Sequence, residues 1–217
     1  MLVFWKEKLV FLAVPKTGTT ALEGALAPRA SMVIRDPPEL KHSAIYRYRR
    51  WLEPFFEKAG RQEMETLAVV RHPVDWLKSW YRYRHRDELA GHPNSTRGLS
   101  FDEFVTDYCR AEPPPHALVG SQATFLLDRD GGLGVDHLFR YEELPALMAF
   151  IEARLGLRPE TKRLNVSPPM ELALSAEVEA RFRQRRAREF AVWERGTGED
   201  AGAAVTAGLR EGRPEDG

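Results

Sequence analysis

The sequence is poor in cysteine, in net charge and in long apolar stretches, and each lack excludes a class of protein. Cys109 is the only cysteine, so no disulfide can form within the chain and a disulfide-built secreted domain is excluded. Lys plus Arg and Asp plus Glu both number 32, so the overall basic excess of a general nucleic-acid-binding protein is missing. No apolar run is long enough to span a bilayer.

The first residues of the sequence predict no secretory signal peptide. The apolar first residues are interrupted by Lys6, Glu7 and Lys8, which is not the pattern of a signal peptide. With the single cysteine, this predicts a cytoplasmic protein without a membrane span. Residues 195–217 are rich in Gly, Ala and charge, and we expect a disordered tail there. Residues 1–194, in a chain that is 43% hydrophobic, are then predicted to form one domain.

Three familiar ligand-binding motifs are also absent. A Walker A loop places its lysine directly after a glycine, whereas here Lys16 precedes Gly18. The three-glycine dinucleotide fingerprint is missing, and no His, Cys, Asp and Glu residues show metal-ligand spacing. The sequence therefore predicts no metal site.

What the chain does have is an alternation of short apolar strands with helices. Residues 9–14 are an apolar run ended by Pro15, and residues 66–70 are a second such run followed by Pro73, which suits the first turn of a helix. Alternating strands and helices predict an α/β fold with a central parallel sheet flanked by helices on both faces. The expected strands are residues 9–14, 32–34, 66–70 and 135–139; the expected helices are residues 19–26, one from Pro73, one capped by Ser100 and Glu103, 142–155 and 175–193.

The first motif is Pro-Lys-Thr-Gly-Thr-Thr at residues 15–20, between the first strand and the first helix. The N–H groups at the start of a helix and the helix dipole favour an anion at this place. Gly18 allows close approach of the backbone, and Lys16 supplies a mobile positive charge. The segment therefore predicts a phosphate-binding loop, although an ordinary turn with a surface lysine is the alternative.

The second motif follows the second predicted strand and has the pattern Arg-x-Pro-x5-Ser. Arg71 comes directly after the strand, and Ser79 lies two turns into the next helix. A guanidinium group offers a planar fork to phosphate oxygens, and serine adds a neutral donor. Pairing of Arg71 with a local carboxylate such as Asp75 is the alternative interpretation.

Together the two motifs resemble those of sulfotransferases that use 3′-phosphoadenosine 5′-phosphosulfate (PAPS). Residues 11–22 resemble the 5′-phosphosulfate loop of that family, and residues 70–79 resemble its 3′-phosphate element. The short chain and the Lys41-His42 segment look more like the bacterial and carbohydrate-type branch. The resemblance implies a three-layer fold like that of P-loop nucleotide kinases, and transfer of a sulfuryl group from PAPS to an acceptor hydroxyl without a metal.

The resemblance also assigns roles to individual residues. Lys16 would stabilise the leaving oxygen, and Arg163, in a late basic loop, would contact the 3′-phosphate unless that loop is merely solvated. Gln122 and the pair Tyr141-Glu142 recur in similar proteins without an assignable role. The expected cofactor-binding residues are Lys16, Thr17, Gly18, Thr19, Thr20, Arg71, Ser79 and Arg163.

An alcohol acceptor also requires a base. His42 is the first candidate because imidazole titrates near neutral pH, and Glu39 is the second. A plain surface histidine is the alternative. No motif in the sequence identifies the acceptor, which is a small molecule or a glycan. Residues 37–63 and 85–116 are expected to line its site. The aromatic residues among residues 46–56 could stack on a sugar or belong to the core.

Two other functions remain open from the sequence. A P-loop-like kinase of a small molecule would need ATP and magnesium, and the position of Lys16 speaks against it. A non-catalytic nucleotide-binding module would keep both phosphate motifs and lack the base. The sequence does not indicate an oligomeric state.

Overall fold

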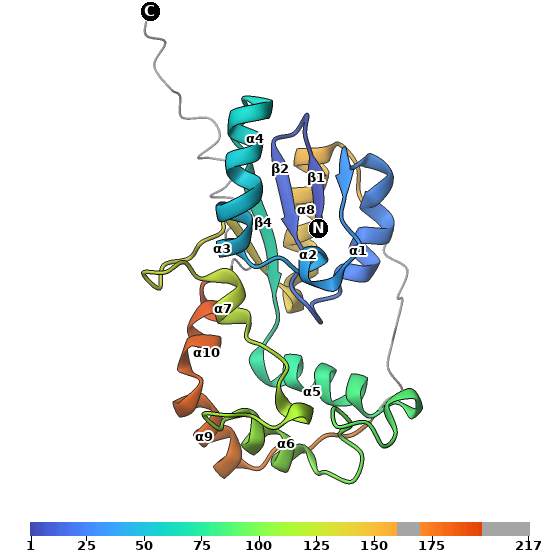
Figure 1. The fold of residues 1–217 in the computed structure, drawn as a ribbon, viewed down its shortest axis with the longest axis vertical. Coiled ribbons are helices and arrows are strands. Elements are labelled where there is room, and N and C mark those ends of the chain that lie inside the picture. The colour runs from blue at the N-terminus through green and yellow to red at the C-terminus, as the bar shows by residue number, and fades with distance from the viewer. Residues whose placement is uncertain (160–169, 197–217) are drawn as a thin grey trace, which may run out of the picture.

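A five-stranded sheet forms the centre of the computed structural model, which describes residues 1–159 and 170–196 (Figure 1). The strands lie in the order β3-β1-β2-β4-β5. Three neighbours, β2, β4 and β5, pair in parallel. Their bounds are β1 Leu2–Phe4, β2 Leu9–Leu12, β3 Met32–Val33, β4 Glu65–Val70 and β5 His137–Arg140.

The sheet is mixed, so the prediction of a parallel sheet is wrong for the edge formed by β1 and β3. Strand β1 pairs antiparallel with both β2 and β3. The charged residues at positions 6–8 belong to a tight turn, in which the Lys8 N–H donates to the Trp5 carbonyl at 3.3 Å. Two strands joined by so short a turn must run antiparallel. The charges that distinguish the first residues from a signal peptide thus belong to the turn of a hairpin.

Helices cover both faces of the sheet, as the sequence predicts for an α/β fold. Side chains alternate along β2: Leu9 and Phe11 pack with α1 and α8, whereas Val10 and Leu12 pack with α3, α4 and α7. The helices on these faces are α1 Thr19–Leu26, α3 Ile45–Arg47, α4 Glu53–Gly60, α7 Gln122–Leu126 and α8 Leu144–Leu155, with the short α2 Pro38–Lys41 before α3 and a π-helical turn Tyr48–Leu52 between α3 and α4.

A second group of helices lies beyond the ends of the strands, beneath the sheet in Figure 1. It has its own apolar cluster, in which Trp76, Phe104 and Phe182 are buried. The Ser100 and Glu103 capping box is present. The predicted helix over residues 175–193 is two helices, because Arg186 has non-helical angles and its guanidinium donates to the Tyr108 and Arg110 carbonyls. The bounds are α5 Pro73–Arg84, α6 Phe101–Tyr108, α9 Ala176–Arg185 and α10 Ala187–Glu194.

Some predictions fall outside the described residues. These are the role of Arg163 and the disorder of the tail from residue 197 onward. Among the helices that are described, none has the length and apolar character needed to cross a bilayer.

Candidate functional site

The loop between β2 and α1 is held in an unusual backbone conformation. Lys16 and Gly18 both have left-handed φ angles, 66° and 74°. The buried Thr17 hydroxyl donates to the Val14 carbonyl at 2.9 Å and closes the loop. The N–H groups of residues 16–20 donate to no other described residue. A run of free N–H groups at a helix start is a typical anion-binding arrangement.

Gly18 is required by its surroundings as well as by its φ angle. A Cβ atom at this position would lie 2.7 Å from Cε2 of Tyr141, which is closer than real Cβ contacts. The same tyrosine ring faces the guanidinium of Arg71, with 4.6 Å between Cζ and the ring centroid. Tyr141 therefore lies between the two predicted motifs and contacts both.

Arg71 is fixed at the end of β4 by its backbone. The Gln122 amide accepts from the Arg71 N–H at 2.9 Å and donates to the Arg71 carbonyl at 2.8 Å. The guanidinium NH1 donates to the Lys16 carbonyl at 3.4 Å, while the buried Nε has no partner among the described residues. Asp75 pairs with Lys78 at 3.5 Å, so the alternative pairing of Arg71 with Asp75 is not found.

Helix α5 connects the second motif to the first. The indole N–H of Trp76 donates to the Pro15 carbonyl at 2.9 Å, which fixes the helix against the loop. Ser79 lies three residues further along the same helix, and its hydroxyl bonds to no other described residue. The two motifs, which lie far apart in sequence, are thus adjacent in the structure.

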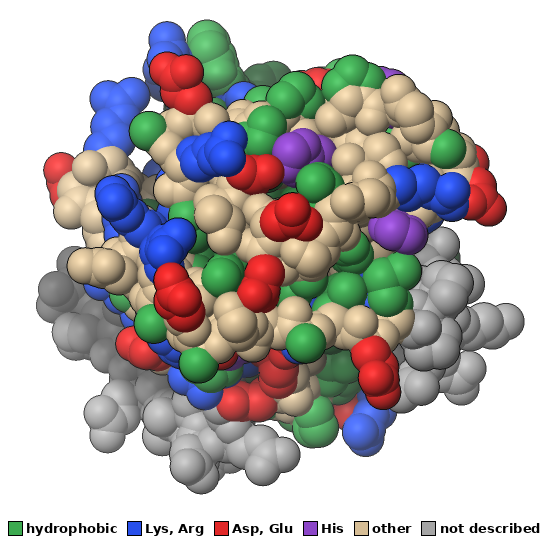
Figure 2. All heavy atoms as spheres, turned by 90° about the horizontal axis from the view of Figure 1, so that it is seen from below, with side chains coloured by type: hydrophobic (Ala, Val, Ile, Leu, Met, Phe, Trp, Pro, Cys, Tyr) green, Lys and Arg blue, Asp and Glu red, His purple; other side chains and the backbone are tan. Residues whose placement is uncertain are grey.

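Lys16 lies in a strongly positive environment. Its Nζ is 4.1 Å from the ring centroid of Tyr83 and 5.5 Å from that of Trp80, on α5. Burial, with the cations of Arg86 and Arg71 nearby, lowers the pKa of Lys16 to about 8. Acidic and basic side chains are intermixed on the molecular surface seen from below (Figure 2).

His42 is oriented as a proton acceptor. Its Nδ1 lies 2.7 Å from the carbonyl oxygen of Ala13. A carbonyl can only accept, so Nδ1 carries the proton and Nε2 keeps a free lone pair. Burial lowers the pKa of His42 below its usual value, which favours the neutral form near pH 7. Glu39, the second candidate, is exposed on α2, and its carboxylate contacts no other described residue.

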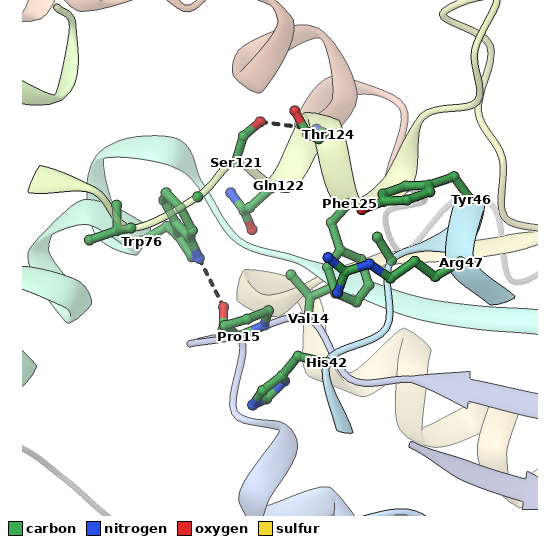
Figure 3. Close-up of a pocket in the computed structure, with 13 residues that line it drawn as sticks. Val14, Pro15, His42, Tyr46, Arg47, Trp76, Ser121, Gln122, Thr124 and Phe125 are labelled. Atoms are coloured by element: carbon green, nitrogen blue, oxygen red, sulfur yellow. Dashed lines mark hydrogen bonds between the residues drawn. The ribbon is translucent and has the colours of Figure 1, made fainter. Parts of the chain in front are cut away.

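A cavity of about 200 Å³ extends from His42 (Figure 3). Arg47 lines it from α3 and forms no ion pair with a described carboxylate. The residues that line the cavity are Val14, Pro15, His42, Ala44, Tyr46, Arg47, Trp76, Val119, Gly120, Ser121, Gln122, Thr124 and Phe125. Of the two segments expected to line an acceptor site, residues 37–63 contribute to this cavity and residues 85–116 do not; residues 119–125 form another part of its wall.

The aromatic residues before β4 divide between the core and the surface. Tyr48 and Phe56 are buried, while Tyr46 lines the cavity. Trp51 and Phe55 are 66% and 59% exposed, and neither lines the cavity. Only one of the five is thus placed to contact a molecule bound beside His42.

Sequence reasoning missed the group that supports Gln122. Glu189, on α10, is buried and accepts from the Ser121 hydroxyl and from the backbone N–H groups of Gln122 and Ala123 at 3.1 and 3.4 Å. Burial raises the pKa of Glu189, against the effect of these hydrogen bonds. The sequence gives no direct signal for such a contact, since 67 residues separate Glu189 from Gln122.

No group of three or more His, Cys, Asp and Glu side chains suited to a metal ion occurs in residues 1–159 and 170–196. Comparison of the chain with protein-family models, curated proteins and solved structures gave no match. The candidate site is therefore interpreted from its own geometry and from the two sequence motifs.

Proposed function

We propose that the protein transfers a sulfuryl group from PAPS to a hydroxyl group of an acceptor bound beside His42. One observation carries this proposal: the loop at residues 16–20 and the end of β4 together present unpaired donors and cations. These include five backbone N–H groups, the Lys16 ammonium and the buried, unpartnered Nε of Arg71. A ligand with two separate phosphate groups matches this set of donors.

The fold supports the same assignment. A buried strand, an anion-binding loop and a helix follow one another from β2 to α1, and β4 lies parallel to β2 with Arg71 at its carboxyl end. Ligands of open α/β sheets bind beyond the carboxyl ends of the strands. We interpret the mixed sheet as a variant of the P-loop nucleotide kinase-like architecture that the motifs predict.

Two sets of residues would bind the two phosphate-bearing ends of PAPS. The N–H groups of residues 16–20 and the Lys16 ammonium would hold the 5′-phosphosulfate, and Arg71 and Ser79 would hold the 3′-phosphate. The Thr17 hydroxyl proton is already used within the loop, so its contribution is the backbone N–H. As the donor substrate, PAPS supplies an electrophilic sulfur and a stable leaving group.

His42 and Lys16 would move and stabilise charge during transfer. The acceptor oxygen forms a bond to sulfur while the bond from sulfur to the 5′-phosphate breaks, releasing adenosine 3′,5′-bisphosphate. Nε2 of His42 takes the hydroxyl proton, and the Lys16 ammonium stabilises the negative charge on the departing oxygen. The cavity beside His42, with Tyr46 and Phe125 in its wall, would hold a small hydroxyl compound or one end of a glycan.

Titration calorimetry with adenosine 3′,5′-bisphosphate tests the proposal. We expect micromolar binding to the wild-type protein and at least about 10-fold weaker binding to Lys16→Ala and to Arg71→Ala. The matched control is Lys78→Ala, which removes a cation of α5 that is paired with Asp75. The control should bind like the wild type.

Three results would contradict the proposal. A folded wild-type protein that does not bind the bisphosphate would exclude PAPS as its substrate. Binding of ATP that depends on magnesium would instead support a kinase. Bisphosphate binding without turnover of any hydroxyl acceptor would support a nucleotide-binding module without catalysis.

A further inference from the structure

One tyrosine ring contacts two cations from distant parts of the chain. Tyr83 lies in the last turn of α5, and the Lys16 Nζ is 4.1 Å from its ring centroid. Cζ of Arg86, just past the end of the helix, is 4.2 Å from the same centroid. An aromatic face attracts cations by its quadrupole, so one ring orders both side chains, and the charge of Arg86 is close enough to lower the pKa of Lys16.

Arg86 differs from the other arginines of this segment in having no protein acceptor. Arg82 donates to the Met170 carbonyl at 3.0 Å, and Arg84 donates to the Pro115 and Leu118 carbonyls at 2.5 and 2.9 Å. The nearby carboxylate of Asp87 pairs with Arg97. Among the described residues, Arg86 forms neither a hydrogen bond nor an ion pair through its side chain, so its five N–H donors are available to a ligand.

Holding two like charges at one ring costs free energy unless an anion lies near them. No carboxylate in residues 1–159 or 170–196 forms an ion pair with Lys16 or with Arg86. The protein thus keeps a pair of unneutralised cations beside the loop at residues 15–20. An arrangement of this kind suits the end of a ligand that carries more than one negative charge.

We propose that Arg86, held with Lys16 on the ring of Tyr83, binds the 5′-phosphate end of the donor nucleotide. This inference rests on the proposed function and adds Arg86 and Tyr83 to the residues that it assigns. Arg86 would contact the nucleotide directly. Tyr83 would act as a positioning residue, through its aromatic face and not through its hydroxyl group.

A pair of nucleotides that differ only in the 5′-phosphate tests this inference. Adenosine 3′,5′-bisphosphate carries the group, and adenosine 3′-monophosphate lacks it. We expect Arg86→Gln to bind the bisphosphate about 10-fold more weakly than the wild type and to bind the monophosphate unchanged. Arg71→Gln should weaken the binding of both, because the 3′-phosphate is common to them.

Two further variants separate positioning from loss of structure. Tyr83→Phe keeps the aromatic face and should bind the bisphosphate like the wild type, whereas Tyr83→Leu should weaken bisphosphate binding and leave monophosphate binding unchanged. Lys78→Gln, which removes another α5 cation, is the control and should bind both nucleotides normally. Circular dichroism confirms that each variant is folded.

The outcomes distinguish this inference from the proposed function. If the wild type binds the bisphosphate but Arg86→Gln binds it equally well, or loses equal affinity for both nucleotides, the role of Arg86 is wrong and the proposed function stands. If the folded wild type binds neither nucleotide, both proposals fail.

Discussion

The side-chain amide of Gln122 forms hydrogen bonds with both the N–H and the carbonyl of Arg71, at 2.9 and 2.8 Å. Gln122 is fully buried, so water does not replace these bonds when they are lost. Arg71 follows directly on β4, and the amide therefore fixes the point from which its guanidinium reaches the Lys16 carbonyl. The interaction connects α7 to the end of the sheet.

Replacement of Gln122 by leucine should therefore destabilise the protein. Gln122→Leu leaves the N–H and carbonyl of Arg71 unpaired in the interior, and we expect the free energy of unfolding to fall by about 1–3 kcal/mol. Urea unfolding measures the change. Gln62→Leu is the control, because the side-chain amide of Gln62 bonds only to the Glu63 carbonyl, at the surface. It should change stability by less than about 0.5 kcal/mol, and equal stability of both variants would contradict the role of Gln122.

Two glycines with similar backbone angles should respond differently to alanine. Gly18 and Gly98 have φ angles of 74° and 80°, so alanine is strained at either position by about 1 kcal/mol. Only at Gly18 does the new Cβ meet another group, the Tyr141 ring. We expect Gly98→Ala to lower stability modestly and to bind adenosine 3′,5′-bisphosphate normally. Gly18→Ala should be less stable and bind at least about 10-fold more weakly; equal calorimetric affinities would argue against close backbone approach at the loop.

The pH dependence of turnover should reveal His42 as the base. Burial lowers its pKa below 6.5, so the imidazole is neutral at pH 7 and becomes protonated only in more acidic solution. The value of kcat/KM should therefore be level near pH 7 and fall along a limb centred below pH 6.5. His42→Gln should abolish this limb and most turnover while binding the bisphosphate normally. His92→Gln, a change in the exposed loop between α5 and α6, should do neither.

Binding of the bisphosphate should be coupled to proton uptake by Lys16. Its pKa of about 8 means that, at pH 8, roughly half of the free protein has a neutral Lys16. A bound phosphate favours the charged form, so binding at pH 8 should take up as much as about half a proton. Calorimetry in buffers of different ionisation enthalpy measures the uptake.

Lys16→Arg is the control for this experiment, because arginine keeps the charge but does not titrate near pH 8. The variant should bind the nucleotide without the additional uptake. The same uptake in both proteins would show that another group is responsible.

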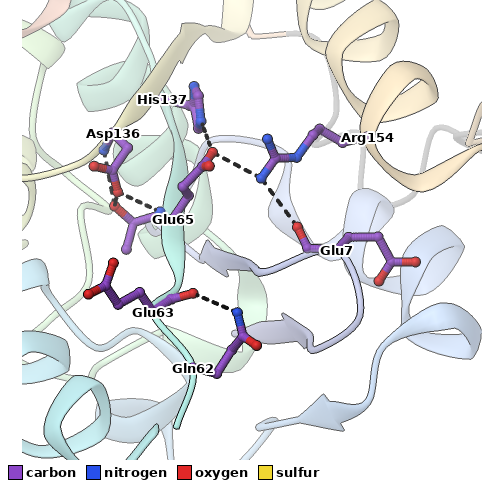
Figure 4. A network of polar contacts seen from close by, with 8 residues as sticks. Glu7, Gln62, Glu63, Glu65, Asp136, His137 and Arg154 are labelled. Carbon is purple, nitrogen blue, oxygen red and sulfur yellow. Dashed lines mark hydrogen bonds and ion pairs between the residues drawn. The ribbon is translucent and has the colours of Figure 1, made fainter. Parts of the chain in front are cut away.

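A polar network lies at the amino ends of β4 and β5, opposite to the ends that carry the candidate site (Figure 4). It should contribute to stability above acidic pH. Glu65 accepts from His137 at 2.7 Å and from Arg154 at 2.9 Å. Burial alone would raise the pKa of Glu65, but these two contacts outweigh it, and the pKa lies below 4.5. A lowered pKa in the folded state adds stability above the unfolded-state value, and that stability is lost as the pH falls through the folded-state value.

Glu65→Gln should therefore lower the free energy of unfolding at pH 7, by about 1 kcal/mol because the carboxylate is partly exposed. The difference from the wild type should disappear in solutions well below pH 4.5. Glu63→Gln is the control, since its carboxylate contacts no other described residue. A difference that is independent of pH would contradict the role of the ionised carboxylate.

The sequence predicted those features that depend on local chemistry. The loop at residues 15–20 and helix α1 follow from an apolar run, a proline and a glycine, and α1 has the predicted bounds. The capping box of α6 follows from Ser100 and Glu103 in the same way. The residues that form such a signal lie within a few positions of one another, so one amino-acid sequence is enough to predict the feature.

Features that depend on distant contacts were not predictable in this way. Strand β1 is stabilised by its pairing with β2 and β3, whereas its own neighbours are charged turn residues. The wall of the cavity at residues 119–125 depends on α7, which Glu189 supports from α10. Neither relationship has a sequence spacing that a motif could express.

The contact between Glu189 and the start of α7 has a consequence for synthesis of the protein. On the ribosome, the loop at residues 15–20 and helix α5 emerge long before α10 does. A nascent chain that ends before Glu189 lacks the carboxylate that accepts from Ser121, Gln122 and Ala123, and Gln122 in turn fixes Arg71. The proposed affinity for the nucleotide should therefore appear only late in translation, once α10 has left the exit tunnel.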